Sequence, residues 1–362
     1  MPVSLLTPIA TDLHVSEGQA GQAISVSGAF AVLASLLISP LAGRRDRRIL
    51  LLSLTGLMML SGAIVALAPN YATFMVGRAL IGIVIGGFWS LSAATAMRLV
   101  PEDQVPRALA IFNGGNALAT VVAAPLGSFL GGLVGWRGAF FCLVPVAVVV
   151  FLWQLKTLPS MKPEPRSRSN NLLKLLKQPV VALGLVAVSL FFMGQFALFT
   201  YLRPFLEAAA HVDVPILSLL LLLMGVTGFI GTILIGSFLT SRLYQTLIAL
   251  PVLMAAIASA LALSDGWIIA VAPLLGFWGL FATSAPVGWW TWLSQTLPED
   301  AEAGGGLMVA VVQLAITSGA VVGGILFDTI GYQMTFGASA VLLVAAALFA
   351  ILTRQTVGSQ PA

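Results

Sequence analysis

The sequence predicts an all-α integral membrane protein. Its charged residues are clumped, and eleven uncharged windows of 18 or more residues separate the clumps. Hydrophobic residues make up 59% of the chain and charged residues 8%, whereas about a quarter of the residues in a soluble domain are charged. A helix needs about 20 apolar residues to cross a bilayer, where its backbone polar groups must be satisfied within the helix. We therefore expect one membrane-spanning helix from each window, and a soluble fold is excluded.

The windows follow one another over most of the chain. They comprise residues 18–43, 49–77, 79–97, 108–136, 138–155, 178–202, 214–241, 243–264, 266–298, 303–327 and 329–353. Ahead of them, residues 1–10 are apolar or small but too few to cross a bilayer. No basic region or cleavage site precedes them, so they do not resemble a signal peptide. We expect these residues to be the stub of a truncated first helix.

The basic residues predict how the helices are threaded, because short cytoplasmic loops are enriched in Lys and Arg. Arg44, Arg45, Arg47 and Arg48 mark one connection as cytoplasmic, and alternation from there places 14 of the 17 basic residues on that side. The central linker and the C-terminus are therefore expected in the cytoplasm. The basic residues lie in loops and not in a basic face interleaved with aromatic side chains, so we expect no nucleic-acid partner.

An internal repeat divides the chain. Residues 100–103 match residues 297–300, and residues 135–140 match residues 331–336, at separations of 197 and 196. Two nearly equal separations favour a duplication into two six-helix halves with the first helix restored, although short turn sequences can also recur by chance. Parallel halves of this kind are a transporter architecture with a site at the midplane. The predicted parts are an N-terminal half (1–155), a linker (156–178), a C-terminal half (179–353) and a tail (354–362).

Residues 39–48 resemble the cytoplasmic signature between the second and third helices of the major facilitator superfamily. The sequence departs from it at Ser39, Gly43 and Asp46, where the family usually has Gly, Asp and Gly. A carboxylate among guanidiniums at a helix end can form a latch that breaks when one half rocks against the other. The resemblance implies a cytoplasmic gate loop, and a plain positively charged anchor is the alternative. The gate residues would be Arg44, Asp46, Arg47 and Arg48.

Residues 77–82 resemble the fourth-helix signature of the superfamily's proton-coupled drug-efflux branch. Arg78 stands eight residues after Asn70, which places it about 12 Å along its helix. A guanidinium at that depth needs a carboxylate or carbonyl partner, so we expect Arg78 to be a buried charge or a coupling residue. The alternative is a side chain that snorkels to the outer interface. Residues 123–127 resemble a degenerate antiporter motif of this branch, although close helix packing alone would explain them.

Six runs distributed over the chain resemble the bacterial purine ribonucleoside efflux pumps of this branch. They are residues 2–8, 86–89, 97–101, 194–197, 199–204 and 286–289. The resemblance implies a monomeric pump of the bacterial inner membrane that exports nucleosides such as inosine and guanosine. Export would be in exchange for protons by alternating access, with no cofactor beyond the proton gradient. A sugar or multidrug efflux antiporter of the same superfamily is the alternative.

The candidate substrate residues follow from the chemistry of a purine nucleoside, which has a flat π face and a neutral ribose rich in hydroxyl groups. We expect aromatic faces from Trp89, Phe192, Trp278 and Trp289. Trp290 and Trp292 are instead expected in the aromatic belt at the membrane interface. The expected hydrogen-bonding amides and hydroxyls are those of Asn113, Asn116, Gln195, Thr200 and Gln313. Hydrogen bonding between helices is the alternative role of each of these amides.

The proton site is harder to place, because none of the 13 acidic residues lies inside a window. A proton antiporter needs a protonatable group in or near its cavity. The resembled pumps carry an acid just before the segment that matches Pro2, so we expect the coupling acid in the absent part of that helix. If the chain is whole, coupling falls to Asp12, His14 or His211 near the outer face, or it is lost. No span holds a cluster of catalytic or metal-ligating side chains, so we expect neither an enzyme nor a metal site.

Overall fold

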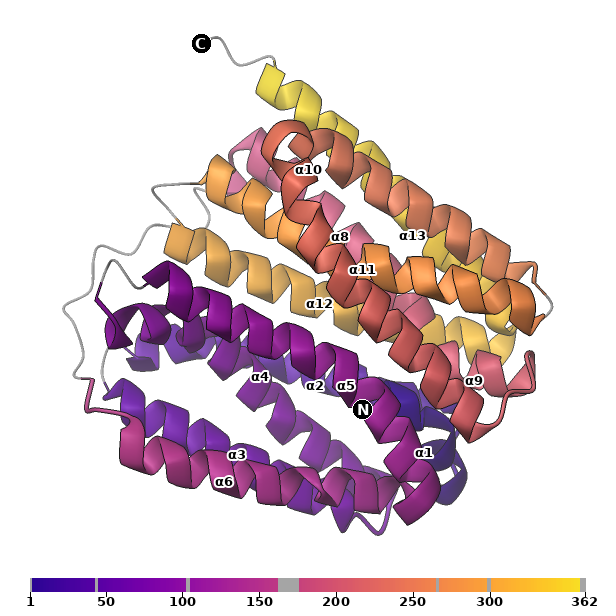
Figure 1. The fold of residues 1–362 in the computed structure, drawn as a ribbon, viewed down its shortest axis with the longest axis horizontal. Helices are drawn as coiled ribbons and strands as arrows, with labels where there is room; N and C mark the ends of the chain where they lie inside the picture. Colours follow the sequence, from indigo (N-terminus) through magenta and orange to yellow (C-terminus); the bar gives the residue numbers. More distant parts are fainter. Residues whose placement is uncertain are drawn as a thin grey trace.

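Two bundles of helices lie side by side in the computed structural model, which describes residues 2–42, 45–101, 105–161, 176–264, 267–297 and 301–358. The N-terminal bundle is at the lower left of Figure 1 and the C-terminal bundle at the upper right. The first bundle contains η1 (Val3–Leu5), α1 (Leu6–Asp12), α2 (Glu17–Ala42), α3 (Arg47–Ala66), α4 (Tyr71–Leu99), α5 (Val105–Phe141) and α6 (Leu143–Thr157). The second contains α8 (Pro179–Thr200), α9 (Leu202–Ala208), α10 (Val214–Ala262), α11 (Ile268–Thr296), α12 (Ala301–Thr329) and α13 (Tyr332–Gly358). The described residues contain no strand, so the prediction of an all-α fold is confirmed.

The predicted windows correspond to helical spans, although one boundary differs. In the described part of the chain, ten segments are long and apolar enough to cross a membrane, and one of them, Val121–Thr157, covers two windows. The backbone leaves the helical region at Gly135 (φ 73°, ψ 166°), which separates the two spans within this segment. The expected eleven complete spans are thus confirmed. Windows 49–77 and 79–97 meet at Arg78, but α3 ends at Ala66 and α4 begins at Tyr71, so Arg78 lies inside α4 and does not mark its start.

Short polar residues begin several of these helices. The Asn70 side chain accepts a hydrogen bond from the Thr73 N–H at 2.9 Å at the start of α4, and Asp213 accepts one from the Ile216 N–H at 3.0 Å at the start of α10. Such caps satisfy N–H groups that have no partner inside a helix. The polar residues between windows therefore both end the membrane spans and stabilise the next helix.

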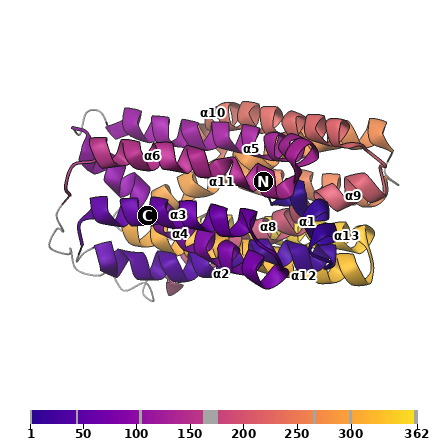
Figure 2. The ribbon, with the colours of Figure 1, turned by 90° about the horizontal axis from the view of Figure 1, so that it is seen from below.

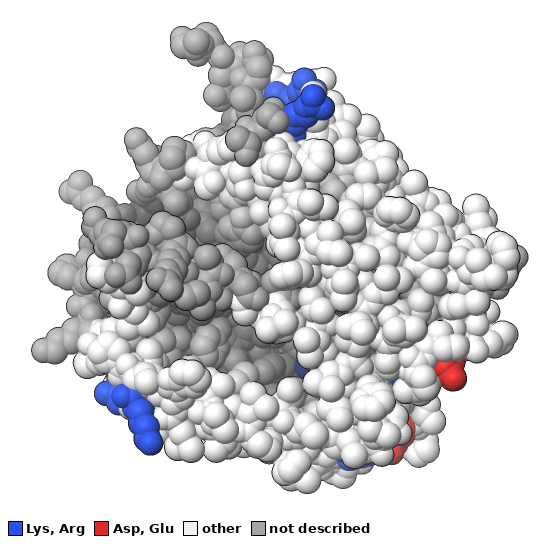
Figure 3. Space-filling model, viewed as in Figure 1, with Lys and Arg blue, Asp and Glu red and all other residues white. Residues whose placement is uncertain are grey.

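The helices run lengthwise between two ends of the molecule. At one end, called the linker end, α6 ends and α8 begins. The other end, called the opposite end, contains α1 and α9, which lie close together in Figure 2. On the face shown in Figure 3, Lys and Arg lie mainly toward the linker end and Asp and Glu toward the opposite end. Among the described residues, the linker end comprises residues 42, 45–47, 99–101, 105, 157–161, 176–179, 296–297 and 301, and the opposite end comprises residues 12–17, 66–71, 200–214 and 329–332.

The two segments of the second repeat match have the same local structure. Gly135 and Gly331 both have positive φ (73° and 112°), a conformation that favours glycine. Each is followed by an aromatic pair four residues apart that packs edge to face: Trp136 with Phe140 at 6.4 Å and Tyr332 with Phe336 at 5.9 Å between ring centroids. The first match falls largely outside the described residues, as do residues 162–175 of the predicted linker.

The N-terminal segment is helical and packs against both bundles. Leu5 and Leu6 are buried, and Leu5 lies against Gly131 of α5. The buried Arg203 of α9 donates a hydrogen bond to the Ser4 carbonyl oxygen and forms an ion pair with Glu207 at 2.7 Å. Apolar packing on one side and a charge-assisted hydrogen bond on the other therefore hold this segment at the opposite end.

Candidate substrate cavity

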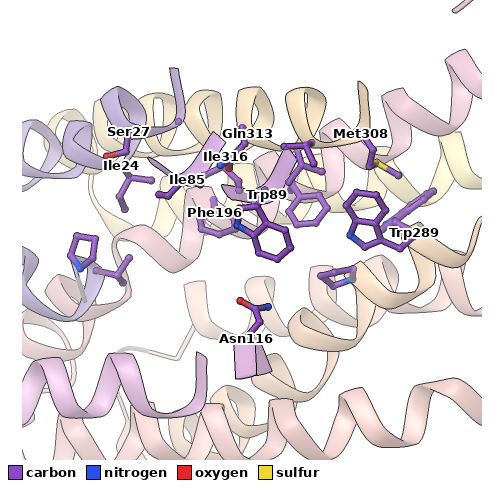
Figure 4. Close-up of a pocket in the computed structure, with 18 of the residues that line it drawn as sticks. Ile24, Ser27, Ile85, Trp89, Asn116, Phe196, Trp289, Met308, Gln313 and Ile316 are labelled. Atoms are coloured by element: carbon purple, nitrogen blue, oxygen red, sulfur yellow. The ribbon is translucent and has the colours of Figure 1, made fainter. Parts of the chain in front are cut away.

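A cavity of about 410 Å³ lies between the two bundles, and both contribute to its lining. Its size falls in the range of small-molecule sites, about 300 to 1,000 Å³. α2, α4 and α5 line it from the N-terminal half, and α8, α11 and α12 from the C-terminal half. Figure 4 shows Asn116 facing the other labelled side chains across the open space. The lining is mostly apolar and aromatic, with a few polar groups, as is usual for a site that binds a small organic molecule.

One face of α4 supplies the longest stripe of the wall. Arg78, Ile85 and Trp89 all line the cavity, and at spacings of seven and eleven residues they share a face of the helix. Trp89 lies about 16 Å further along the axis than Arg78. Gly82 and Gly86 hold this helix against α2, because a Cβ at either position would overlap a backbone carbonyl of α2. The close crossing fixes the direction in which the stripe points.

Arg78 is buried at the end of this stripe that is nearer the start of α4, with 7% of its surface exposed. Its Nε donates a hydrogen bond to the Ala23 carbonyl oxygen at 3.2 Å. The Ser27 hydroxyl lies 2.8 Å from the carbonyl oxygens of both Ala23 and Arg78, so its single proton is shared between them. The alternative that Arg78 snorkels to the interface is therefore wrong. No acidic side chain in the described ranges forms an ion pair with Arg78.

The C-terminal half contributes aromatic faces and one amide. Phe192 and Phe196 come from α8, Trp289 and Trp290 from α11, and Gln313 from α12. These helices are apolar on nearly every side, because lipid, the partner half and their own bundle all contact them. Their sequences therefore do not indicate which face borders a cavity. The structure shows that Trp290 lines it, in addition to the expected Trp289.

The structure brings together five of the nine expected substrate residues, namely Trp89, Asn116, Phe192, Trp289 and Gln313. Gln195, Thr200 and Trp278 do not line the cavity. Trp278 is 1% exposed inside the C-terminal core. The Gln195 Oε1, Thr200 Oγ1 and Trp278 Nε1 atoms are buried without a hydrogen-bond partner among the described residues. The side chain of Asn113 lies outside the described residues.

Several lining residues carry no signal that the sequence could reveal. Ser27, Phe196 and Met308 are ordinary members of apolar helices, and only their neighbours in space distinguish them. Trp292 is the reverse case, because it is fully buried in the C-terminal core and not in an interfacial belt. The expectation of a belt position is therefore wrong for Trp292. The indole packs edge to face on Trp289 at 5.9 Å instead.

The two halves are joined by hydrogen bonds toward the opposite end. Ser25 and Thr317 exchange hydrogen bonds between α2 and α12, with each hydroxyl donating to the other's carbonyl at 3.2 and 3.3 Å. Asp328 accepts hydrogen bonds from the Gly18 N–H at 2.9 Å and from the Ser16 hydroxyl. These contacts close the space between α2 and α12 at the opposite end.

This architecture agrees with the comparison of the chain with known families. The profile of the Major Facilitator Superfamily matches residues 1–305. The chain belongs to the major facilitator superfamily. It is a multi-pass membrane protein of a transporter family, in which a small molecule binds between two helical halves.

Individual relatives within the superfamily extend over nearly the whole chain. The chain is 62% identical over 360 residues to the transcription regulatory protein OpdE of Pseudomonas aeruginosa, covering 98% of this chain and 90% of OpdE. It is 41% identical over 348 residues to the purine ribonucleoside efflux pump NepI of Escherichia coli, covering 96% of this chain and 88% of that protein. NepI of Salmonella enteritidis is also 41% identical, over 350 residues.

The loop that resembles the gate signature of the major facilitator superfamily is attached to its own half. Asp46 caps α3 by accepting a hydrogen bond from the Arg48 N–H at 2.8 Å, and it also accepts hydrogen bonds from the Ser160 hydroxyl and the Met161 N–H. The hydrogen bond from Ser160, with that from Met161, lowers the pKa of the Asp46 carboxyl. Arg48 donates to the Leu155 carbonyl oxygen at 2.7 Å, and Arg44 lies outside the described residues. These contacts fasten α3 to the chain after α6.

Proposed function

We propose that this protein exports purine ribonucleosides from the cytoplasm in exchange for protons, by alternating access of the cavity to the two sides of the bacterial inner membrane. The observation that carries the proposal is a cavity between the halves that combines indole and phenyl faces with amide groups and one guanidinium. Identity of 41% over 96% of the chain to proteins named purine ribonucleoside efflux pumps supports the same substrate class.

The chemistry of the lining suits a purine nucleoside better than a sugar. Trp89, Trp289 and Trp290 line the cavity, and aromatic faces stack on a flat heterocycle. Asn116 and Gln313 each offer a donor and an acceptor to ribose hydroxyls or to the edge of the base. A sugar exporter would gain from polar groups on several walls, whereas this lining is mainly apolar.

The distribution of charge supports an orientation with the linker end in the cytoplasm, because the basic loops are at that end. In that orientation, the hydrogen bonds between the halves at the opposite end support a state that loads substrate from the cytoplasm. Release requires the contacts at the opposite end to separate and the linker end to close. The predicted linker of residues 156–178 would be long enough to let the halves rock against each other.

The test is uptake of labelled inosine into inside-out vesicles with an acidic lumen. We expect uptake that unlabelled guanosine competes with and that collapses when the proton gradient is dissipated. Trp289→Ala should raise the KM for inosine, because it removes an aromatic face from the cavity. Trp267→Ala is the matched control, since Trp267 precedes the same helix as its N-cap residue, is 64% exposed and lies outside the lining.

Lack of any competed uptake would overturn the proposal, and sugar or drug substrates would then be assayed in the same vesicles. A second candidate function is the regulation of transcription, and it rests on the 62% identical relative named a transcription regulatory protein. If the protein regulates transcription directly, a variant that binds ligand without transporting it should still change transcript levels. If transcript levels change only in variants that transport, the effect arises indirectly from the exported nucleoside.

A further inference from the structure

We propose that Arg78 determines specificity, by donating hydrogen bonds to the O6 and N7 acceptors of a 6-oxopurine. The cavity would thereby select inosine-like and guanosine-like nucleosides over 6-aminopurine nucleosides. This inference rests on the proposed function and assigns the recognition of the base to one residue. It gives Arg78 a role in binding substrate rather than in carrying the coupling proton.

The first step of the argument is the hydrogen bonding of the guanidinium. An arginine has five N–H donors and no acceptor. The Nε–H of Arg78 is occupied by the Ala23 carbonyl oxygen, but no described residue accepts a hydrogen bond from Nη1 or Nη2. The side chain lines the cavity. Four donors on the terminal nitrogens are thus left for a molecule that enters the cavity.

The second step is the charge. Arg78 is the one charged residue among those that line the described cavity, and the described ion pairs of the protein involve Arg137 and Arg203 instead. A guanidinium at membrane depth without a carboxylate is costly. A ligand that presents two acceptors to the terminal nitrogens would offset part of that cost, because hydrogen bonds from a charged donor are stronger than neutral ones.

The third step is the pattern of acceptors on the two kinds of purine. A 6-oxopurine presents two adjacent acceptors, O6 and N7, to which arginine binds with its two-pronged fork. A 6-aminopurine presents the N7 acceptor beside the N6 amino donor. The amino group would face an N–H of Arg78, leaving donors on both sides unpaired. Buried unpaired donors cost free energy, so the mismatch lowers affinity for adenosine.

The other polar groups that line the cavity do not make this distinction. Asn116 and Gln313 each carry both a donor and an acceptor, so the chemistry of an amide does not by itself distinguish the two kinds of purine. Ser27 shares its proton between two backbone carbonyls and holds the backbone of Arg78 to α2. In Figure 4, Ser27 and Ile24 lie toward one end of the cavity, with Trp89 and Trp289 farther along. This arrangement gives one end a fixed donor and leaves aromatic faces for the rest of the ligand.

The experiment measures inhibition constants of unlabelled nucleosides against labelled inosine in the same inside-out vesicles. For the wild type we expect inosine to bind about ten- to a hundredfold more tightly than adenosine, the discrimination of a good bidentate pair. Purine riboside, which lacks O6, and 7-deazainosine, which lacks N7, should each bind more weakly than inosine. In Arg78→Gln the preference should fall toward one, through loss of inosine affinity with little change for adenosine.

Binding to the purified protein in detergent, followed by tryptophan fluorescence, keeps the test valid if a variant no longer transports. Retained adenosine binding by Arg78→Gln shows that the variant is folded. Arg78→Lys, which keeps the charge without the planar fork, should recover only part of the inosine preference. A global loss of folding would instead abolish binding of both nucleosides in the Gln variant, and the ratio would then be read from Arg78→Lys.

Two results would overturn the inference while leaving the proposed function intact. One is an unchanged ratio of adenosine to inosine affinity in both Arg78 variants. The other is a loss of affinity, relative to inosine, that is larger for 2′,3′-dideoxyinosine than for purine riboside in the wild type, and that disappears in the Arg78 variants. That result would place the ribose, and not the base, at the guanidinium. Failure of every nucleoside to compete in the wild type would instead contradict the proposed function itself.

Discussion

Ser27 shows how a single hydroxyl can matter to both stability and binding. Its hydroxyl lies 2.8 Å from the Arg78 carbonyl oxygen, which joins α2 to α4, and 2.8 Å from the Ala23 carbonyl oxygen of its own helix. Ser61 makes a similar contact elsewhere, where its hydroxyl donates to the Gly77 carbonyl oxygen at 2.7 Å and joins α3 to α4. Both serines are buried, with 4% and 2% of their surface exposed. The two residues therefore form a matched pair that differs in whether the contact adjoins the cavity.

We expect Ser27→Ala and Ser61→Ala to lower the free energy of unfolding by similar amounts, about 1 kcal/mol each, because each removes one buried hydrogen bond. Only Ser27→Ala should also raise the KM for inosine, since it loosens the backbone that positions Arg78. Thermal unfolding in one detergent measures the first effect, and vesicle uptake measures the second. Equal KM values for the two variants would mean that Ser27 acts only through stability.

The sequence indicates some of these residues, and the reason is chemical. Arg78 stands out because a charge in a membrane span is rare, and Trp89 and Gln313 because indoles and amides are unusual among aliphatic residues. Ser27 and Met308 are common types whose position becomes informative only when the packing of α2 and α12 is known. Residue type therefore predicts a candidate, whereas the lining of the cavity depends on helix rotation. Trp278 illustrates the failure, because an expected cavity residue is buried in the core.

At the scale of elements, the helix boundaries follow from the sequence and the crossings do not. Charged and polar residues end the apolar windows, and helix caps form at Asp46, Asn70 and Asp213. The rotation of each helix is set by which small residues face a neighbour. Gly56 and Gly86 look alike in the sequence, yet a Cβ at Gly56 would meet nothing within 4 Å, whereas one at Gly86 would overlap the Ala31 carbonyl oxygen.

This contrast gives a prediction for the contact between α2 and α4. Gly86→Ala should destabilise the protein by about 1 to 3 kcal/mol, because the added methyl group forces two backbones apart in a close-packed crossing. Gly56→Ala should be neutral or stabilising by up to about 1 kcal/mol, since alanine favours a helix more than glycine does. Melting temperatures of the two variants in the same detergent check the difference. Equal melting temperatures would show that α4 can shift without cost.

At the scale of the whole molecule, the described contacts between the two halves run from the opposite end toward the middle of the helices. Ser25 and Thr317 pair across α2 and α12. Farther along the same helix pair, a Cβ at Gly28 would overlap the Thr317 side chain. Gly225 of α10 packs against the backbone of Val121 in α5 on the other side of the cavity. Alternating access requires these contacts to break while new ones form at the linker end.

A disulfide across the closed end tests this requirement. The native cysteine, Cys142, is first replaced by serine, and Ser25→Cys and Thr317→Cys are combined, since these residues already lie in hydrogen-bonding contact. We expect oxidation to stop inosine transport and a reductant to restore it. Inosine binding to the oxidised protein should persist, because the cross-link joins two residues that are already in contact in this structure and leaves the cavity lining unchanged.

Single cysteine variants provide the control for the chemistry of oxidation, and they should keep transporting. The complementary pair, with cysteines near Asp46 and Arg242, should block transport by holding the linker end closed. In that variant binding should be lost from the linker side, so the two cross-links give opposite binding results with the same loss of transport. Undiminished turnover by either oxidised double variant would contradict rocking of the two halves. The substrate would then cross the membrane although the halves could not separate at the opposite end, or could not separate at the linker end.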